Sequence, residues 1–310
     1  MKLIFMGTPA YAVNTLNALL EAGHEILGVF AQPDKPVGRK HVVTPPPVKV
    51  CAEEHGIPVY QPNNWKDGEA AKIVADLAPE VIVVVAYGKI LPEEVLAIPP
   101  YGCINGHASL LPAYRGASPI QWCIVSGETK TGVTTMLMDK GMDTGDILET
   151  VMTDIGSEET ADELFDRLAP LSAELMVKTL ADLESGGVIP KKQPETGISY
   201  APIIKKEMAM LTFQTKTARE LHNAARGFYS WPCAYFFYNG KRVKVLKTAL
   251  SDGTSEAPGT VFKRDKRLLV ACKAGTTLEL MTVQPEGGKP MSGYQMLCGG
   301  KLPLGSVIGG

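Results

Sequence analysis

The sequence predicts an α/β fold with a mostly parallel sheet, followed by a small antiparallel β-barrel. Over the first 150 residues, short β-branched runs alternate with longer helical patterns, which is typical of β-α-β units. Residues 81–86 form an unbroken aliphatic run, as expected for a central strand that helices cover on both faces. After residue 218, one helical pattern gives way to short alternating segments and turns, which indicates a small barrel.

The first part of the chain is expected to form a Rossmann-like sheet. The first strand ends at Gly7, but no Gly-x-Gly-x-x-Gly sequence follows it. The dinucleotide-binding fingerprint is therefore absent, and an NAD-dependent dehydrogenase is excluded. We expect strands at residues 2–6, 25–31, 81–86, 102–105 and 134–137, and helices at residues 10–22, 48–55, 68–78 and 161–184.

A break in the pattern divides the chain into two domains. Residues 190–208 hold three prolines and four lysines without a clean hydrophobic period, so they predict a linker. This places one domain at residues 1–189 and a second at residues 209–310. The second domain is expected to contain a helix at residues 218–225 and strands at residues 234–238, 241–248, 259–264, 268–271 and 277–283.

Composition excludes several classes of protein. Hydrophobic residues make up 45% of the chain and charged residues 21%, which is ordinary for a globular protein. The longest aliphatic run is far shorter than the roughly 20 residues that a bilayer requires, and the N-terminal apolar run is too short for a signal peptide. The six cysteines are scattered without a Cys-x-x-Cys pair, so they predict reduced thiols and no structural zinc. We expect a cytoplasmic protein without a membrane partner.

The two parts of the chain differ sharply in charge. Residues 1–190 carry 13 basic and 25 acidic side chains, a net charge of −12. Residues 191–310 carry 18 basic and 8 acidic side chains, a net charge of +10. A small domain with this charge favours a polyanionic partner, because each neutralised phosphate releases counterions. A generic basic surface is the alternative.

The segment with the most chemical content is Asn105-Gly106-His107, at the end of an expected strand. Asn105 and His107 are two residues apart, so both side chains face one side of the pleat, at the edge where open α/β sheets bind ligands. An acidic, glycine-rich loop around Asp143 follows. An amide and a protonated imidazole can stabilise an oxyanion, and a nearby carboxylate can take a proton from an attacking amine. On spacing alone, a structural histidine and an Asp143 that caps a turn remain open interpretations.

Longer motifs resemble those of the folate-dependent formyltransferases, over nearly the whole chain. The most specific set is Asn-x-His with Ser-Leu-Leu-Pro, then Arg-Gly-Ala-x-Pro-Ile and Asp-Thr-Gly-Asp, at residues 105–112, 115–120 and 143–146. Further similar motifs are Phe-x-Gly-Thr-Pro at residues 5–9, the loop 32–40, Ala-Tyr-Gly-Lys-Ile-Leu-Pro at residues 86–92, Tyr-Ala-Pro at residues 200–202 and Trp-Pro at residues 231–232.

This resemblance implies transfer of a formyl group from 10-formyltetrahydrofolate, without a metal, to the amino group of methionine on initiator tRNA for translation initiation. It implies that Asn105, His107 and Asp143 are catalytic. It also implies a tRNA-binding C-terminal barrel and a monomeric protein. The implied folate contacts are Ser109, Leu110, Leu111, Pro112, Tyr87, Gly88, Ile90, Leu91 and Asp139. The implied tRNA contacts are Arg39 and Lys40, in an exposed loop at residues 34–47, together with Lys205 and Lys206.

Two features depart from the family pattern. Gly106 lies between Asn105 and His107 where the family usually carries valine, and glycine loosens a strand and removes a β-branched side chain. This change is expected to affect the pocket rather than the reaction. Residues 302–310 are atypical, and part of them is expected to form a short docking strand or tail.

Two alternatives remain open at the level of sequence. Glycinamide ribonucleotide and amino-sugar formyltransferases share the same catalytic logic, but the basic second domain and the basic loop suit a tRNA substrate better. The second alternative is a non-catalytic RNA-binding protein on an enzyme scaffold. The intact set of Asn105, His107 and Asp143 argues against it.

Overall fold

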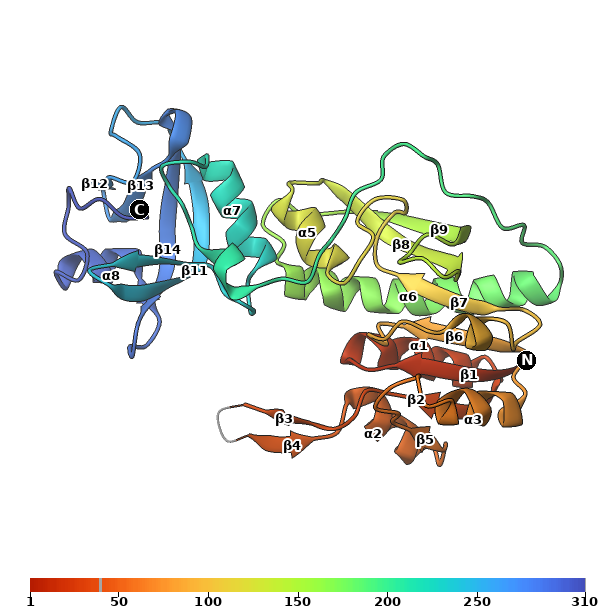
Figure 1. The fold of residues 1–310 in the computed structure, drawn as a ribbon. Coiled ribbons are helices and arrows are strands. Elements are labelled where there is room, and N and C mark those ends of the chain that lie inside the picture. Colours follow the sequence, from red (N-terminus) through yellow and green to blue (C-terminus); the bar gives the residue numbers. More distant parts are fainter. Residues whose placement is uncertain (39–40, 310) are drawn as a thin grey trace. The chain divides into compact units, whose positions relative to one another are not determined.

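The computed structural model describes residues 1–38 and 41–309, and the chain forms two compact units (Figure 1). Unit 1 comprises Met1–Pro119, Lys130–Asp154 and Phe165–Pro202. Unit 2 comprises Ile120–Thr129, Ile155–Leu164 and the chain from Ile203 onward. Two stretches of the first part of the chain therefore belong with the C-terminal part. None of the helices in the described residues is long and apolar enough to cross a membrane.

Unit 1 is built on a seven-stranded sheet in the order β5-β2-β1-β6-β7-β8-β9. The strands from β5 to β7 in that order pair in parallel, whereas β8 and β9 join antiparallel. This confirms the predicted mostly parallel sheet. The strands are β1 (Lys2–Gly7), β2 (Glu25–Phe30), β5 (Val59–Tyr60), β6 (Val81–Val85), β7 (Cys103–His107), β8 (Lys130–Leu137) and β9 (Asp146–Asp154).

Helices bury the central strands, as the aliphatic run at residues 81–86 predicted. All five residues of β6 are buried. On one face, Phe30 and Trp65 stack with ring centroids 5.7 Å apart in the core beneath α3. The helices of this part of the chain are α1 (Ala10–Glu21), α2 (Pro47–Glu54), α3 (Glu69–Leu77), α4 (Glu93–Leu96) and α6 (Ala161–Glu184).

Some elements differ from the sequence prediction. The hairpin of β3 (Lys35–Val37) and β4 (Val42–Thr44), the helix α5 (Pro119–Val125) and the strand β9 were not predicted. β9 is an edge strand, and after Leu148 none of its side chains is fully buried, so its sequence lacks a hydrophobic period. The hairpin includes three exposed residues in β4 and so carries no core signal.

Residues 190–202, whose composition resembles a linker, make ordered contacts within unit 1. Lys191 and Ile147 exchange two backbone hydrogen bonds, of 2.7 and 2.8 Å. Further along, Tyr200 forms an isolated β-bridge with Arg115. Ile147 lies at the start of β9, and Arg115 lies in the loop after β7, so this segment runs beside the region where the candidate site lies.

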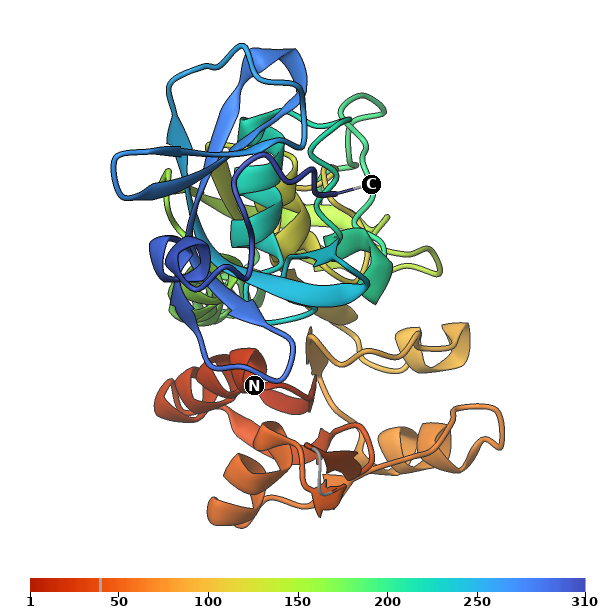
Figure 2. The same ribbon diagram turned by 90° about the vertical axis from the view of Figure 1, so that its left-hand side faces the viewer.

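Unit 2 contains the predicted β-rich C-terminal fold, a curled antiparallel sheet in the order β10-β11-β14-β13-β12 with β15 paired to β14 (Figure 2). Register shifts occur in β11 between Val245 and Thr248, where the strand bends. Its core includes Phe213 and Phe236, which meet edge to face with centroids 5.9 Å apart. The elements are η1 (Lys206–Ala209), α7 (Ala218–Gly227), β10 (Tyr235–Tyr238), β11 (Lys241–Ser251), β12 (Val261–Arg264), β13 (Arg267–Ala271), η2 (Lys273–Gly275), β14 (Thr277–Pro285), β15 (Met291–Ser292) and α8 (Gly293–Cys298).

The buried guanidinium of Arg226 fastens one of the early stretches to α7 within unit 2. Its Nη1 donates to the carbonyl oxygens of Gly156 and Glu159, at 3.1 and 2.8 Å, and its Nη2 donates to Asn223 at 2.8 Å. From the other early stretch, Trp122 meets the ring of α7's C-cap residue, Phe228, edge to face. These contacts explain why residues 120–129 and 155–164 belong to this unit.

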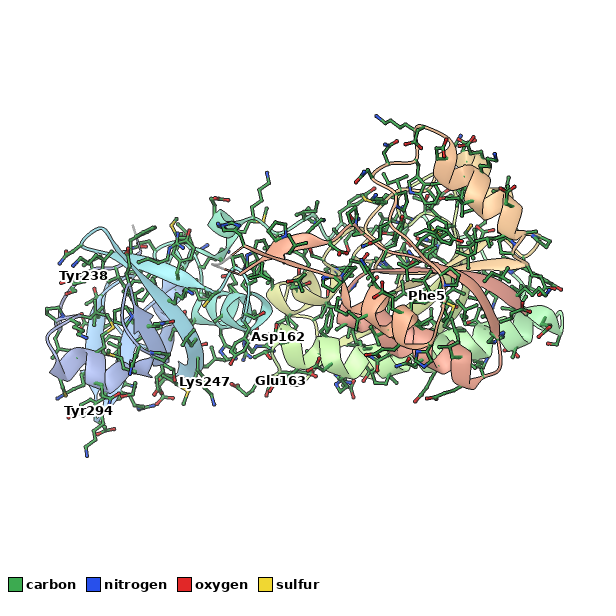
Figure 3. The ribbon with its side chains drawn as sticks, turned by 90° about the horizontal axis from the view of Figure 1, so that it is seen from below. Phe5, Asp162, Glu163, Tyr238, Lys247 and Tyr294 are labelled. Atoms are coloured by element: carbon green, nitrogen blue, oxygen red, sulfur yellow. The ribbon has the colours of Figure 1, made fainter. Side chains whose placement is uncertain are left out.

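Two helix starts in unit 2 share one capping arrangement. At α7, Glu220 Oε2 accepts from Thr217 N at 2.8 Å, and Thr217 Oγ1 accepts from Glu220 N at 3.3 Å. At the start of α6, Glu163 accepts from the backbone and hydroxyl of Thr160, which lowers the pKa of Glu163, and Lys247 adds to this effect (Figure 3). Both carboxylates therefore stabilise their helices in the ionised form.

Replacing Glu220 by alanine should lower the free energy of unfolding of unit 2 by about 0.5–1 kcal/mol at pH 7, the usual contribution of a capping carboxylate. Hydrogen bonds from Thr217 lower the pKa of Glu220 in the folded protein. Its stabilisation is therefore present above the unfolded pKa and lost as the pH falls through the folded pKa. Urea unfolding from pH 7 to pH 3.5, followed by tryptophan fluorescence in a Trp65→Phe background, should show the deficit narrowing. Glu256→Ala, at an exposed loop position, is the control, and a deficit independent of pH would contradict the role of the carboxylate.

Candidate active site

β7 holds Asn105 and His107 where the sheet changes from parallel to antiparallel pairing. Val84 of β6 lies opposite Asn105 in the parallel ladder, and Thr134 of β8 lies opposite His107 in the antiparallel ladder. With both sides of the strand paired, the two-residue period places both side chains on one face. Gly106 lies on the other face, toward α6. The ring of His107 is nearly buried, with 7% of its side chain exposed.

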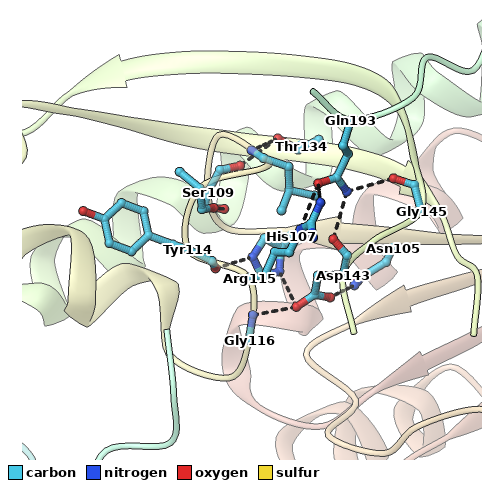
Figure 4. Close-up of polar contacts among 12 residues, drawn as sticks. Asn105, His107, Ser109, Tyr114, Arg115, Gly116, Thr134, Asp143, Gly145 and Gln193 are labelled. Atoms are coloured by element: carbon cyan, nitrogen blue, oxygen red, sulfur yellow. Dashed lines mark hydrogen bonds and ion pairs between the residues drawn. The ribbon is translucent and has the colours of Figure 1, made fainter. Parts of the chain in front are cut away.

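A backbone carbonyl fixes the tautomer of His107. Its Nε2 lies 2.9 Å from the carbonyl oxygen of Tyr114 (Figure 4). A carbonyl only accepts hydrogen bonds, so Nε2 carries a hydrogen. This leaves Nδ1 toward Asp143, 3.8 Å from Oδ2. A second proton on Nδ1 would therefore produce an imidazolium directly beside a carboxylate.

The carboxylate of Asp143 is held by groups from two other segments. Its Oδ2 accepts a hydrogen bond from the backbone N–H of Gly116 at 2.7 Å, and its Oδ1 lies 3.4 Å from Asn105 Nδ2. The residue has φ = +55°, a left-handed conformation that few residues other than glycine adopt. The structure thus brings Asn105, His107 and Asp143 together, as expected from the sequence, and their roles remain predictions.

Local contacts shape the loop that carries Asp143. Asp139 Oδ1 accepts from the backbone N–H of Gly141 at 3.0 Å and from Thr144 Oγ1 at 2.6 Å. A Cβ atom at Gly145 would lie 1.8 Å from the carbonyl oxygen of Leu137, so only glycine fits there. Asp139, a predicted folate contact, therefore also organises its own loop.

These groups suit acyl transfer to an amine. The amide of Asn105 and a protonated His107 supply donors for an oxygen that becomes negative, and such donors contribute most where little water enters. Asp143 can hold the imidazolium and receive a proton.

The predicted folate-binding turn, Ser109–Pro112, is tied to β8. Thr134 Oγ1 donates to the carbonyl oxygen of Ser109 at 2.7 Å and accepts from the backbone N–H of Leu111 at 3.2 Å. Ser109 is buried, and its hydroxyl donates to Ala113 O at 2.6 Å. Leu110 is half-buried, and Leu111 and Pro112 are buried. One hydroxyl, that of Thr134, therefore fixes the backbone on both sides of Leu110.

The second predicted folate segment, Tyr87 to Leu91, follows β6. Gln32 Nε2 donates to the carbonyl oxygens of Tyr87 and Gly88, at 3.2 and 2.9 Å. The side chains of Tyr87 and Leu91 are buried in the core, whereas that of Ile90 is 80% exposed. Ile90 is therefore the side chain of this segment that is open to a ligand ring.

The predicted tRNA contacts fall in two places. Arg39 and Lys40 lie outside the described residues. Lys205 and Lys206 are exposed in unit 2, where Lys206 begins the short helix η1. Their role in binding stays a prediction.

Several groups at the site had no individual signal in the sequence. The backbone N–H of Gly116 holds Asp143, and the hydroxyl of Thr134 orders the turn. Gln193 Nε2 donates to the carbonyl oxygens of Asp143 and Gly145, each at 2.8 Å. Gln193 comes from the segment with the composition of a linker, where no period singles it out. Gly116 belongs to the Arg-Gly-Ala-x-Pro-Ile motif, but the sequence gave this residue no role of its own.

The structure gives a reason for glycine at position 106. A Cβ atom there would lie 3.1 Å from Ser172 Oγ, 3.4 Å from Met176 Cε and 3.5 Å from Val85 Cγ2. Both helix residues belong to α6 and are fully buried. Gly106 therefore lets α6 pack closely against the strand that carries Asn105 and His107.

A separate cavity of about 380 Å³ lies at the ends of β2 and β5. Its lining includes Tyr60, Gln61 and Asn63, but none of Asn105, His107 and Asp143. Lys89 joins this region to the segment after β6 by donating to the carbonyl oxygen of Asn63 at 3.0 Å. The geometry of the catalytic groups, not cavity size, therefore identifies the candidate site. In the described residues, no group of three His, Cys, Asp or Glu side chains is arranged to hold a metal ion.

Comparison with known proteins identifies the class. A family described as formyl transferase matches residues 1–180, and one described as formyl transferase, C-terminal domain, matches residues 203–301. The chain belongs to the formyl transferase family.

Full-length relatives narrow this further. The chain is 46% identical to the methionyl-tRNA formyltransferase of Pelobacter propionicus over 310 residues, covering 100% of this chain and 96% of the relative. It is 45% identical to that of Caldanaerobacter subterraneus, covering 99% of this chain and 100% of the relative.

Solved structures show the same fold. An N-formyltransferase from Helicobacter canadensis has a TM-score of 0.68 at 20% identity and covers 90% of this chain and 98% of its own. HypX from Aquifex aeolicus has a TM-score of 0.63 at 15% identity and covers 96% of this chain and 47% of its own.

Gly106→Val should destabilise unit 1 by about 1–3 kcal/mol, because the added carbons must displace Ser172 and Met176 from a packed interior. Gly106→Ala should cost less, since its single Cβ requires shifts of only a few tenths of an ångström. Combining Gly106→Val with Ser172→Ala should recover part of the loss, measured by thermal unfolding. No recovery in the double variant would show that Ser172 does not limit the space at position 106.

Proposed function

We propose that this chain transfers the formyl group of 10-formyltetrahydrofolate to the α-amino group of methionine on initiator methionyl-tRNA, in the cytoplasm and as a monomer, for translation initiation. The observation that carries the proposal is the Asn105, His107 and Asp143 cluster at the C-terminal edge of the sheet. Full-length relatives named methionyl-tRNA formyltransferase support it. Similar solved structures with folinic acid or tetrahydrofolic acid bound support a folate donor.

In the proposed reaction, the methionine nitrogen forms a bond to the formyl carbon, and the bond from that carbon to the folate nitrogen breaks. Because His107 Nε2–H is bound to the carbonyl oxygen of Tyr114, the amide of Asn105 and the Nδ1–H of protonated His107 donate to the formyl oxygen while it carries negative charge. Asp143 takes the proton that the amine loses, directly or through water, and this same proton then passes to the departing folate nitrogen, which restores the carboxylate. The hydrogen bond from Gly116 N to Asp143 keeps the carboxylate oriented for this transfer.

The proposal divides the work along the chain. The site residues up to position 189 perform the chemistry, with Ser109–Pro112, Tyr87–Leu91 and Asp139 near the folate. Residues 209–310 and the basic side chains Lys205 and Lys206 bind tRNA, together with Arg39 and Lys40. The net charge of +10 over residues 191–310 supports a polyanionic acceptor.

A second candidate is transfer to an amino sugar. Sugar N-formyltransferases are among the similar solved structures, and one of them holds dTDP-3-aminofucose. Their identity to this chain is 20% or less. A nucleotide sugar gives little use for the excess of basic residues in the C-terminal part, so the tRNA acceptor is favoured.

Formyl transfer from labelled 10-formyltetrahydrofolate should proceed rapidly to methionyl-initiator tRNA, and not to free methionine or a dTDP-amino sugar. Asp143→Asn should lower kcat by about 10²–10⁴-fold, because it removes the proton acceptor and the partner of the imidazolium. Asp76→Asn, at an exposed position of α3, is the matched control. Product on the sugar would replace the acceptor in the proposal, and near-normal activity of Asp143→Asn would remove this carboxylate from the mechanism.

Binding of tRNA should weaken steeply with salt, by roughly 10³-fold or more between 50 and 200 mM if six or more phosphates are contacted. The physical reason is the release of counterions by the basic C-terminal residues. Fluorescence anisotropy with labelled initiator tRNA measures the slope, and folate binding under the same salt series is the internal control. An equally shallow slope for both ligands would mean that the basic charge serves another purpose.

A further inference from the structure

We propose that Gln193 is a positioning residue for the reaction: it holds the Asp143 loop against Arg115 and so sets the orientation of the catalytic carboxylate. The inference rests on the proposed function of Asp143. It assigns a role to Arg115 and to the Tyr200-Ala201-Pro202 motif, neither of which has a part in the mechanism above.

Both ends of the side-chain amide of Gln193 form hydrogen bonds. Its Oε1 accepts from Arg115 Nε at 3.1 Å and from Nη2 at 2.6 Å, and its Nε2 donates to the carbonyl oxygens of Asp143 and Gly145, each at 2.8 Å (Figure 4). A guanidinium only donates and a carbonyl only accepts, so chemistry fixes which end of the amide faces which partner. Four hydrogen bonds therefore join three segments at one side chain.

The loop requires such a restraint. Asp143 has φ = +55°, which a residue with a side chain keeps only when its surroundings enforce it. Gln193 donates hydrogen bonds to the main-chain carbonyl of Asp143 and to that of Gly145, two residues later. This fixes the peptide planes from which the carboxylate projects toward His107.

The same segment also positions the donor to that carboxylate. Arg115 and Ala201 are joined by a backbone hydrogen bond of 2.7 Å, and Ser118 N donates to Ala201 O at 3.2 Å. A Cβ atom on Gly116 would lie 2.7 Å from Ala201 O. Glycine thus allows residues 114–118 to approach the segment closely enough for the Gly116 N–H to reach Asp143 Oδ2 at 2.7 Å.

Exposure identifies the side chains that matter in this segment. Among residues 191–200, only Gln193 and Ser199 are not exposed. Ser199 Oγ accepts from the backbone N–H of Tyr114, whose carbonyl oxygen fixes the tautomer of His107. Gln193 thus contacts the backbone of Asp143, and Ser199 contacts the backbone of Tyr114, which in turn contacts His107.

Two substitutions at position 193 separate the acceptor bonds to Arg115 from the donor bonds to Asp143 and Gly145. Gln193→Glu keeps an acceptor for Arg115 but loses both N–H donors and places an oxygen against the carbonyl of Asp143. Gln193→Met keeps the length of the side chain and loses both the acceptor and the donors.

Both variants should lower kcat for formyl transfer to methionyl-tRNA about 10- to 100-fold, the effect of a carboxylate misplaced by about 1 Å. KM for folate and for tRNA should stay within about 3-fold. Lys192→Met, at an exposed neighbouring position, is the matched control and should match wild type.

A double-variant cycle tests that Gln193 acts through Asp143. In an Asp143→Asn background, Gln193→Met should produce little further loss of kcat, because the group that it positions is already absent. Multiplicative losses would overturn the proposal, as would normal kcat in both single variants. Hydrogen exchange of residues 138–146 and 114–118 gives a readout that needs no substrate, and it should rise in both Gln193 variants but not in Lys192→Met. A wild-type chain without formyl transfer would refute the proposed function alone, whereas unchanged exchange would refute the role of Gln193 alone.

Discussion

The carboxylate of Asp143 depends on neighbours in a way that the other two groups of the site do not. Asn105 and His107 stand on a strand that is paired on both sides, so their positions follow from the sheet. Asp143 stands in a loop, in a left-handed backbone conformation. Its direction is set by the Gly116 N–H, by the amide of Asn105 and by the grip of Gln193 on its carbonyl. Regular structure thus positions two of the three groups, and individual hydrogen bonds position the third.

Such an arrangement works because buried polar groups must find partners. An unpaired donor or acceptor in the interior costs about 1–3 kcal/mol, so each satisfied contact also excludes alternative loop conformations. Thr134 is an example, because its one buried hydroxyl both donates to Ser109 O and accepts from Leu111 N. The carbonyl oxygen of Tyr114 likewise restrains His107. Because a carbonyl oxygen only accepts hydrogen bonds, it fixes the hydrogen on Nε2.

The parts of this architecture that follow local periodicity could be predicted from the sequence. The buried strand at residues 81–85 follows from an unbroken aliphatic run. The placement of Asn105 and His107 on one face follows from the two-residue period of a strand. Gln193 could not be found in this way, because nothing in its neighbours differs from an exposed, proline-rich segment. Its partners Arg115 and Asp143 are 78 and 50 residues away in the chain, so only the folded structure brings them together. The same holds for Gly106, whose meaning depends on Ser172 of a distant helix.

The contacts of residues 193–201 also show which unit this part of the chain belongs to. Ala201 donates to Arg115 O and accepts from Ser118 N, so the backbone is part of unit 1 up to this residue. Unit 2 begins at Ile203, only two residues later. Composition alone would have allowed a flexible connection anywhere in residues 190–208. Hydrogen bonds instead hold residues 193–201 in place beside the site. If this segment moved freely, both the Asp143 loop and the Gly116 N–H would lose the contacts that position them.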